Sequence, residues 1–243
     1  LLFKRVNKKI YLTPAGETLL RYARRTFQDL KNATLEISEM AHLKKGRLKI
    51  GAGMMACIYL LPPVLEKFKS RFPAIDFEIV TDTTENLLAR VRENDLDLGL
   101  FVLPIEFPDV EVIPIITEEL VVITSPKHPR LSKRTRIRAA ELSEYPLILF
   151  EQGTYTRRVI DAFFEEAGVR PTVSMEAENV AIIKPLVRID LGIAIVPLPA
   201  VIDEAARNEL HYLHFRDRRL TRQLGLVFQK LDTLPRLLSE LVE

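Results

Sequence analysis

The chain has 243 residues, of which 47% are hydrophobic and 28% charged, and its formal net charge is +2. This length and composition are those of one or two globular domains with a sizeable core, and so small a net charge does not indicate that the whole chain binds nucleic acid. The single cysteine excludes a disulfide framework within the chain and fits a reducing, cytoplasmic compartment. No run of 18 apolar residues is present, so the sequence predicts no membrane segment and no membrane partner.

The charge is concentrated at the start of the chain. Residues 1–25 contain seven basic residues and the single acid Glu17, a net charge of +6, so the rest of the chain carries −4 in total. Within this segment, Val6, Ile10 and Leu12 flank a polar turn, a pattern that predicts a short hairpin over residues 1–12. The basic residues of the hairpin are Lys4, Arg5, Lys8 and Lys9.

A long helix is predicted after the hairpin. Thr13 can cap its first turn, and Pro14 lacks the N–H that would be unsatisfied there, while Gly46 ends the pattern after about Lys45. Apolar or small residues recur at alternating steps of three and four, as in a coiled-coil seam with one polar member. The helix could lie on its own domain, but the seam favours dimerisation with a second copy. The seam residues are Leu20, Ala23, Phe27, Leu30, Thr34, Ile37 and Ala41.

From residue 46 onward, strand and helix patterns alternate in units of about 25 residues. They do so once up to residue 126 and again between 145 and 198, and two strand patterns and a helix at 235–243 follow. This alternation is typical of βαβ units around a mostly parallel sheet. We therefore predict an α/β fold with two Rossmann-like lobes and a ligand cleft between them. Lobe I is expected at about 47–122 and 206–243, and lobe II at about 123–205.

Few residues suggest catalysis. The sequence contains no G-x-S-x-G, no G-x-G-x-x-G and no P-loop motif. His211 and His214 lie three apart in a predicted strand, where they would face opposite sides, and Cys57 has no neighbouring histidine. The sequence therefore predicts neither an enzyme nor a metal site nor a cofactor.

Candidate ligand-binding residues lie where predicted strands end and helices begin, because parallel strands present their carboxyl ends and the following helix N-termini at one edge of a sheet. The glycine at 153 lets a backbone approach closely, and the Thr154 hydroxyl could hold a carboxylate or phosphate. A plain helix cap at Thr154 is an equal alternative, as is core packing for Met54 and Met55. The candidates are Gly53, Met54, Met55, Phe101, Val102, Gln152, Gly153, Thr154, Thr156, Glu178, Asn179 and Gly192.

Two groups of motifs resemble one known family. The N-terminal stretches "LFKR" and "LTPAGETLLRYARR" resemble the wing of the winged helix-turn-helix and the start of the linker helix in LysR-type transcriptional regulators. The stretches "LKIGAG", "YLLPPVLEKFKSRFP", "DLDLGLFVLP" and "GVRPTVSMEAENVAIIKPLVRIDLGIAIVP" resemble the effector-binding domain of that family. The resemblance covers essentially the whole chain and implies a fold like that of type 2 periplasmic binding proteins. It divides the chain into a wing remnant at 1–13, a linker and dimerisation helix at 14–45 and an effector-binding domain at 46–243.

The resemblance also implies a function. Regulators of this family bind promoter DNA as homodimers or homotetramers and sense a small-molecule effector between their lobes. The helix that reads bases in the major groove would precede Leu1, so the four basic hairpin residues are expected to contact DNA phosphates only. A periplasmic-type solute-binding protein without DNA binding shares the fold and is the alternative, although it has no use for a basic wing and a long helix.

One residue departs from the family pattern. Where these regulators often carry Ser or Thr near the start of the first effector-domain helix, this chain has Met55, flanked by Met54. Because a thioether donates no hydrogen bond, a small carboxylate would lose one donor there. We therefore expect a more apolar or aromatic effector, with its polar end held by Gly153 and Thr154.

Overall fold

A computed structural model describes residues 1–6, 8–40 and 46–230 of the chain. The predicted hairpin consists of β1 (Phe3–Val6) and β2 (Lys9–Leu12), which pair in antiparallel fashion. It leads into α1 (Pro14–Met40), where the Thr13 hydroxyl accepts a hydrogen bond from the Gly16 N–H at 3.1 Å and so caps the helix as predicted. The last residues of the predicted long helix, 41–45, and the predicted helix at 235–243 lie outside the described residues.

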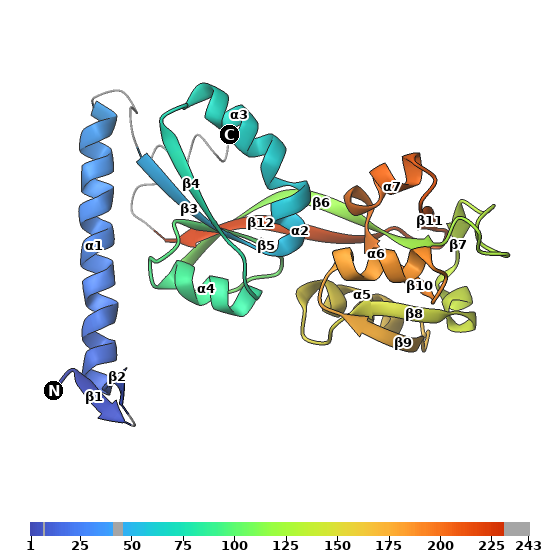
Figure 1. Cartoon of the computed structure of the whole chain (residues 1–243), viewed down its shortest axis with the longest axis horizontal. Helices are drawn as coiled ribbons and strands as arrows, with labels where there is room; N and C mark the ends of the chain where they lie inside the picture. Colours follow the sequence, from blue (N-terminus) through green and yellow to red (C-terminus); the bar gives the residue numbers. More distant parts are fainter. Residues whose placement is uncertain (7, 41–45, 231–243) are drawn as a thin grey trace.

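One curled sheet runs through both lobes, with the strand order β4-β3-β5-β12-β6-β10-β8-β9 (Figure 1). The strands of the first lobe, β3 (Gly46–Ala52), β4 (Ile75–Val80) and β5 (Leu98–Val102), are parallel. In the second lobe, β8 (Pro146–Phe150), β9 (Thr172–Ala177) and β10 (Ile193–Pro197) are also parallel. The two long strands β6 (Val110–Thr124) and β12 (Leu220–Gln229) run antiparallel to each other and connect the lobes.

Helices flank this sheet in both lobes. The first lobe contains α2 (Met54–Tyr59), α3 (Leu61–Arg71) and α4 (Thr84–Arg92). The second contains α5 (Tyr155–Glu166), α6 (Val180–Arg188) and the short α7 (Ile202–Ala206), together with the 3-10 turns η1 (Ala139–Glu144) and η2 (Leu198–Ala200). The small strands β7 (Arg136–Ile137) and β11 (His211–Phe215) complete it. The prediction of an α/β fold with two lobes is confirmed.

The connecting strands belong to the cores of both lobes. In β6, Val110 packs in the first lobe, whereas Leu120 is fully buried in the apolar cluster of the second. In β12 the order is reversed, because Leu220 packs in the second lobe and Phe228 in the first. The lobes are therefore joined by packed strands whose side chains are fixed at both ends.

The boundary between the lobes differs from the expectation in one place. Residues 206–243 were all expected to belong to lobe I. Strand β11, however, pairs with the end of β6 and with β7, and its Leu213 and Phe215 are buried in the second-lobe core. The pattern of a strand does not reveal its pairing partner, and residues 206–215 consequently belong to the second lobe.

Helix α1 lies beside the first lobe, with the hairpin at its far end (Figure 1). Lys31 Nζ lies 2.7 Å from Asp97 Oδ1, immediately before β5, and Arg24 forms an ion pair with Glu93 at the end of α4. Asp97 also accepts a hydrogen bond from the Lys49 backbone N–H at 2.7 Å, so the carboxylate that holds α1 is itself fixed to the sheet.

Candidate functional site: an inter-lobe cavity

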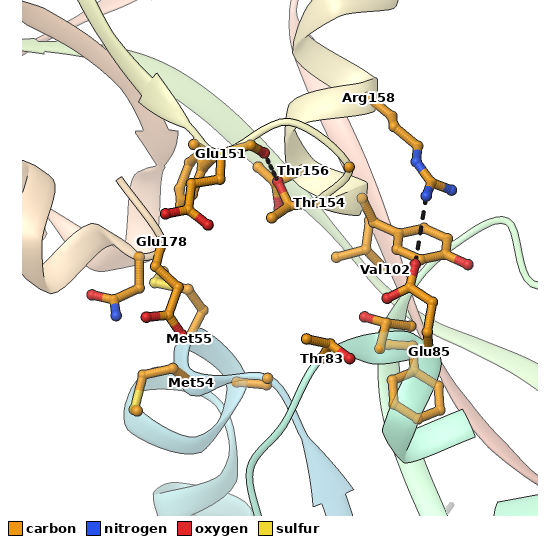
Figure 2. A pocket seen from close by; sticks show the side chains of 18 of the residues that line it. Met54, Met55, Thr83, Glu85, Val102, Glu151, Thr154, Thr156, Arg158 and Glu178 are labelled. Atoms are coloured by element: carbon orange, nitrogen blue, oxygen red, sulfur yellow. Dashed lines mark hydrogen bonds and ion pairs between the residues drawn. The ribbon is translucent and has the colours of Figure 1, made fainter. Parts of the chain in front are cut away.

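A cavity of about 470 Å³ lies between the lobes. Its walls are the segments that follow β3, β4, β8 and β9, together with residues of β5 and β12 (Figure 2). Open α/β sheets bind ligands at this edge, beyond the carboxyl ends of the parallel strands. The volume is within the range of small-molecule sites, which is roughly 300–1,000 Å³.

Eleven of the twelve candidate residues line this cavity. The exception is Gly192, which precedes β10 and does not line it. A Cβ at this position would lie 2.6 Å from the Pro146 carbonyl oxygen, so glycine allows the chain to pass close to β8. The eleven residues that do line the cavity are Gly53, Met54, Met55, Phe101, Val102, Gln152, Gly153, Thr154, Thr156, Glu178 and Asn179.

The junction between β4 and α4 was not among the segments expected to bind a ligand. The rule applied to the other strand–helix junctions would have found it, because Thr83 follows a predicted strand and precedes a predicted helix. Arg222 carried no such signal, since its ion-pair partner Glu118 is 104 residues away in the sequence. The remaining lining residues are Ala56, Asp82, Thr83, Thr84, Glu85, Leu100, Phe150, Glu151, Tyr155, Arg158, Arg222 and Leu224.

Side chains cap three of the helices that begin at the cavity. The hydroxyl of Thr83 caps α4, and the side-chain oxygen of Asn179 accepts two backbone N–H groups of α6. At α5, the Thr154 hydroxyl accepts from the Arg157 N–H at 3.3 Å and donates to the Glu151 carbonyl oxygen at 3.0 Å. The helix-cap alternative for Thr154 therefore describes its bonding here, and its proton is already engaged.

Gly153 and the methionine pair shape the same wall. Gly153 has φ +89°, in the left-handed region that favours glycine, and nothing lies within 4 Å of the place where a Cβ would be. Met54 is 45% exposed, whereas Met55 packs against the core of the second lobe although it belongs to a helix of the first. Met55 thus contributes both to the cavity wall and to the contact between the lobes.

The buried wall of the cavity contains an ion pair. The Nε and Nη2 atoms of Arg222 in β12 donate to Glu118 Oε2 in β6 at 2.8 and 2.7 Å, and both side chains are 3% exposed. Arg222 Nη1 also donates to Thr156 Oγ1 in α5 at 2.6 Å. Burial lowers the pKa of Arg222. This group ties both connecting strands to the first turn of α5, directly beside the cavity.

Two further contacts join the lobes across the cleft. Arg158 Nη2 of α5 lies 3.5 Å from Glu85 Oε1 of α4, and both side chains are more than half exposed (Figure 2). The ammonium of Lys184 in α6 donates to the Tyr59 hydroxyl in α2 at 2.8 Å and pairs with Glu204. Burial opposes the charge of Lys184, but the hydrogen bonds to Glu204 and Tyr59 outweigh it and raise its pKa.

Two kinds of feature are absent from the described part of the chain. No group of three histidine, cysteine, aspartate or glutamate side chains is placed to hold a metal ion. Among the same residues, no helix combines the length and apolarity that crossing a bilayer requires.

The fold and the cavity define a class of protein: a two-lobed α/β ligand-binding domain of the periplasmic-binding-protein-like type, preceded by a basic hairpin and a long helix. The family follows from comparison with known proteins. Residues 41–243 match the family described as "LysR substrate binding domain", so the chain belongs to the LysR family, as its motifs predicted.

Curated relatives are similar over most of their length. The chain is 32% identical to a probable hydrogen peroxide-inducible genes activator of Mycobacterium avium, an alignment that covers 94% of this chain and 73% of that protein. It is 30% identical to the HTH-type transcriptional activator CmpR of Synechocystis sp., with 94% and 75% covered. These relatives are named transcriptional activators, so the chain is a regulator rather than an enzyme, and the solute-binding alternative is not favoured.

Solved structures agree on the fold. A cysteine mutant of OxyR from Corynebacterium glutamicum has a TM-score of 0.76 and 27% identity, over 99% of this chain and 75% of that one. A full-length OxyR mutant from Pseudomonas aeruginosa has a TM-score of 0.82 over 100% of this chain and 78% of that one; at 22% identity this likeness bears on the fold alone.

Proposed function

We propose that this chain acts in the cytoplasm as a ligand-responsive transcriptional regulator that binds promoter DNA as a homo-oligomer and senses a small molecule in the inter-lobe cavity. The observation that carries the proposal is the position of α4. Its first turn, with Thr84 and Glu85, lines the cavity, and its far end, at Glu93, pairs with α1. A ligand that changes the angle between the lobes would therefore act on an element in direct contact with the helix that follows the basic hairpin.

The seam of α1 supports dimerisation. The contacts of α1 with its own lobe come from Arg24, Gln28 and Lys31. Seam residues lie elsewhere on the helix: Phe27 is 73% and Leu30 59% exposed. An apolar stripe left uncovered by its own chain is suited to a second copy of the same helix. Leu20 and Thr34 are exposed too and Ala23 is half-buried, whereas Ala41 and the side chain of Ile37 lie outside the described part of the chain.

Sedimentation equilibrium tests the dimer. We expect Phe27→Glu to raise the dimer dissociation constant at least tenfold, because a buried carboxylate without a partner would be left in the seam. Tyr22→Glu is the matched control, since Tyr22 is 64% exposed on the same helix but off the seam. Equal effects of the two substitutions, or none for Phe27→Glu, would exclude the seam as the interface.

The basic hairpin supports contact with DNA phosphates. All four basic side chains, those of Lys4, Arg5, Lys8 and Lys9, are exposed. No base-reading helix is found among the described elements, so we expect the chain by itself to bind DNA weakly, with little sequence preference and a strong dependence on salt.

Titration of a mixed-sequence duplex at several salt concentrations tests this proposal. Replacing Lys8 and Lys9 by glutamate should lower the affinity and reduce the slope of log K against log salt by about two. The control replaces the exposed Lys127 and Lys133 of the second lobe, with the same change in charge. An unchanged slope in the hairpin variant, or tight, salt-tolerant footprinting by the chain, would contradict the proposal.

Some relatives are named as hydrogen peroxide-inducible genes activators. At this cavity, however, the chain has no cysteine thiol that peroxide could oxidise. Cys57 is the single cysteine of the sequence and does not line the cavity. Its thiol lies 3.6 Å from the Ala52 carbonyl oxygen, and burial raises its pKa. Reactive cysteines have lowered pKa values, so we propose a reversibly bound small molecule as the signal.

A thermal-shift screen of metabolites with the full chain tests ligand sensing. A ligand at a hundred times its dissociation constant stabilises the folded state by about 2.7 kcal/mol. Gly53→Phe should abolish the shift, because Gly53 lines the cavity with open space around its Cβ position and φ −65°, so the new ring fits without backbone strain. A shift that persists in this variant would place the binding site elsewhere.

A further inference from the structure

The ionisable residues of the cavity wall are mostly acidic. Two cations line it, Arg158 and Arg222. Each already has a carboxylate partner: Glu85 for Arg158, and Glu118 for Arg222. An anionic ligand would therefore find no unpaired cation on the described wall. The acids that line the cavity are Asp82, Glu85, Glu151 and Glu178.

Two of these acids are available to a ligand. Asp82 is engaged at the start of α4, where it accepts hydrogen bonds from the Thr83 N–H and the Asn86 side chain. The carboxylates of Glu151 and Glu178, by contrast, have no ion-pair or hydrogen-bond partner among the described residues. Both are exposed at the ends of strands of the second lobe.

The positions of these two side chains favour a joint role. In Figure 2 both carboxylates lie on the side of the cavity nearest Met54 and Met55, whereas the Glu85–Arg158 pair lies on the opposite side. Carboxylates beside thioethers and apolar side chains suit an organic cation. The carboxylates can pair with its charge, and the thioethers and apolar side chains can cover its carbon skeleton.

Helix N-termini are the competing effect. Each helix that begins at the cavity favours an anion at its N-terminus, and three of them already have side-chain caps. A full charge held close to a carboxylate interacts more strongly than it does with the partial charge of a helix end. Two unpaired carboxylates acting on one cation therefore outweigh the helix ends on their side of the cavity.

We infer that the effector carries a positively charged nitrogen, as an ammonium or guanidinium group, and that Glu151 and Glu178 form the subsite that receives it. This inference rests on the proposed ligand-sensing function and adds the chemical class of the ligand. The cavity establishes that a small molecule fits; the unpaired carboxylates decide its charge.

The charge of this wall can be measured without knowing the effector. Labelling the methionine methyl groups of the full chain with carbon-13 makes Met54 and Met55 reporters inside the cavity, and Met175 on β9 a reporter outside it. Two nitroxide probes of equal size, one carrying an ammonium and one a carboxylate, then relax each methyl according to their local concentrations. We expect the cationic probe to relax Met54 and Met55 about threefold more strongly than the anionic one, and Met175 about equally.

Matched variants assign this difference to the subsite. Glu151→Gln with Glu178→Gln should bring the ratio at the cavity methyls close to one. Glu106→Gln with Glu165→Gln changes the net charge equally at exposed positions outside the cavity and should leave the ratio unchanged. Stronger relaxation of Met55 by the anionic probe, or a ratio that the first variant leaves unchanged, would overturn the inference.

The thermal-shift screen separates this inference from the proposed function. A hit that is cationic at pH 7 and binds at least about tenfold more weakly to the Glu151→Gln, Glu178→Gln variant supports both. A purely anionic hit that Gly53→Phe abolishes would refute the cationic class and leave ligand sensing in the cavity intact. If every hit still binds to the Gly53→Phe variant, the proposed ligand sensing in the cavity is refuted, whatever the charge of the hits.

Discussion

The buried ion pair between the connecting strands allows a quantitative prediction. Arg222 and Glu118 face each other in the β12–β6 ladder. The Nε and Nη2 atoms of Arg222 both donate to the same oxygen of Glu118, Oε2. Glu118→Gln can keep that oxygen as an acceptor while it removes the charge. An arginine does not give up its proton in proteins, so its charge would remain buried without a counter-charge.

The expected cost of Glu118→Gln is about 3 kcal/mol in the free energy of unfolding. Removing one partner of a buried pair costs about 3–5 kcal/mol, and the retained acceptor places this substitution at the lower end. Replacing both partners, Glu118→Leu with Arg222→Met, should instead be neutral or stabilising by about 1–2 kcal/mol, because two expensive desolvations disappear together. Because removal of either partner alone leaves the other charge buried without a counter-charge, the non-additivity of the two sites should be about as large as the two single effects together.

Urea denaturation followed by circular dichroism measures these values, since the chain has no tryptophan for fluorescence. Glu78→Gln is the control: its partner Arg47 lies 2.9 Å away but is 63% exposed, so the loss should stay within about 0.5 kcal/mol. A loss below about 1 kcal/mol for Glu118→Gln, or a double variant as unstable as the single ones, would show that water reaches this pair and that the reasoning from burial is wrong.

The remaining predictions concern the pH dependence of stability and a closely packed glycine. The side-chain hydrogen bond from Arg134 lowers the pKa of Glu141 from its ordinary 4.5 to about 2, so this carboxylate stabilises the folded state above pH 4.5 and loses that contribution as the pH falls towards 2. Because the pair is partly exposed, we expect Glu141→Gln to cost only about 1 kcal/mol at pH 7 and nothing at pH 2, measured by urea denaturation at both values. Gly192→Ala should cost about 1–3 kcal/mol because its Cβ would collide with the Pro146 carbonyl oxygen, whereas Gly53→Ala should be nearly neutral in the same assay; similar losses for both would contradict the packing argument.

Local patterns predicted most of the fold. Alternating strand and helix patterns gave both lobes, and the rule that ligands bind at the carboxyl ends of parallel strands placed eleven of twelve candidate residues on one cavity. The exception, Gly192, precedes a strand and does not follow one, so it belongs to the opposite end of β10. Gly192 is needed because the chain packs closely against β8. A sequence alone does not distinguish a glycine required for packing from one required for ligand binding.

What escaped prediction depends on long-range pairing. The first half of β6 contains Pro114, and because proline is rare in central strands, the sequence does not indicate that this half pairs with β12. The structure accommodates it at an irregularity, where Pro114 faces Gly225 and the register shifts between Leu224 and Gly225. The Glu118–Arg222 pair was hidden for the same reason, since its register exists only once β6 and β12 are aligned.

That irregularity also bears on how the lobes could respond to a ligand. The pairing of β6 with β12 is continuous on either side, and both strands are anchored in both cores, so the lobes cannot turn about a loose linker. Bending at the register shift disturbs the fewest ladder hydrogen bonds, because Pro114 has no N–H to donate and the shift leaves Ile115 without a partner in β12. Leu224, the last residue before the shift, lines the cavity. The part of the connection that bends most easily therefore lies beside the proposed ligand site, where the size and charge of a bound molecule would act directly on the angle between the lobes.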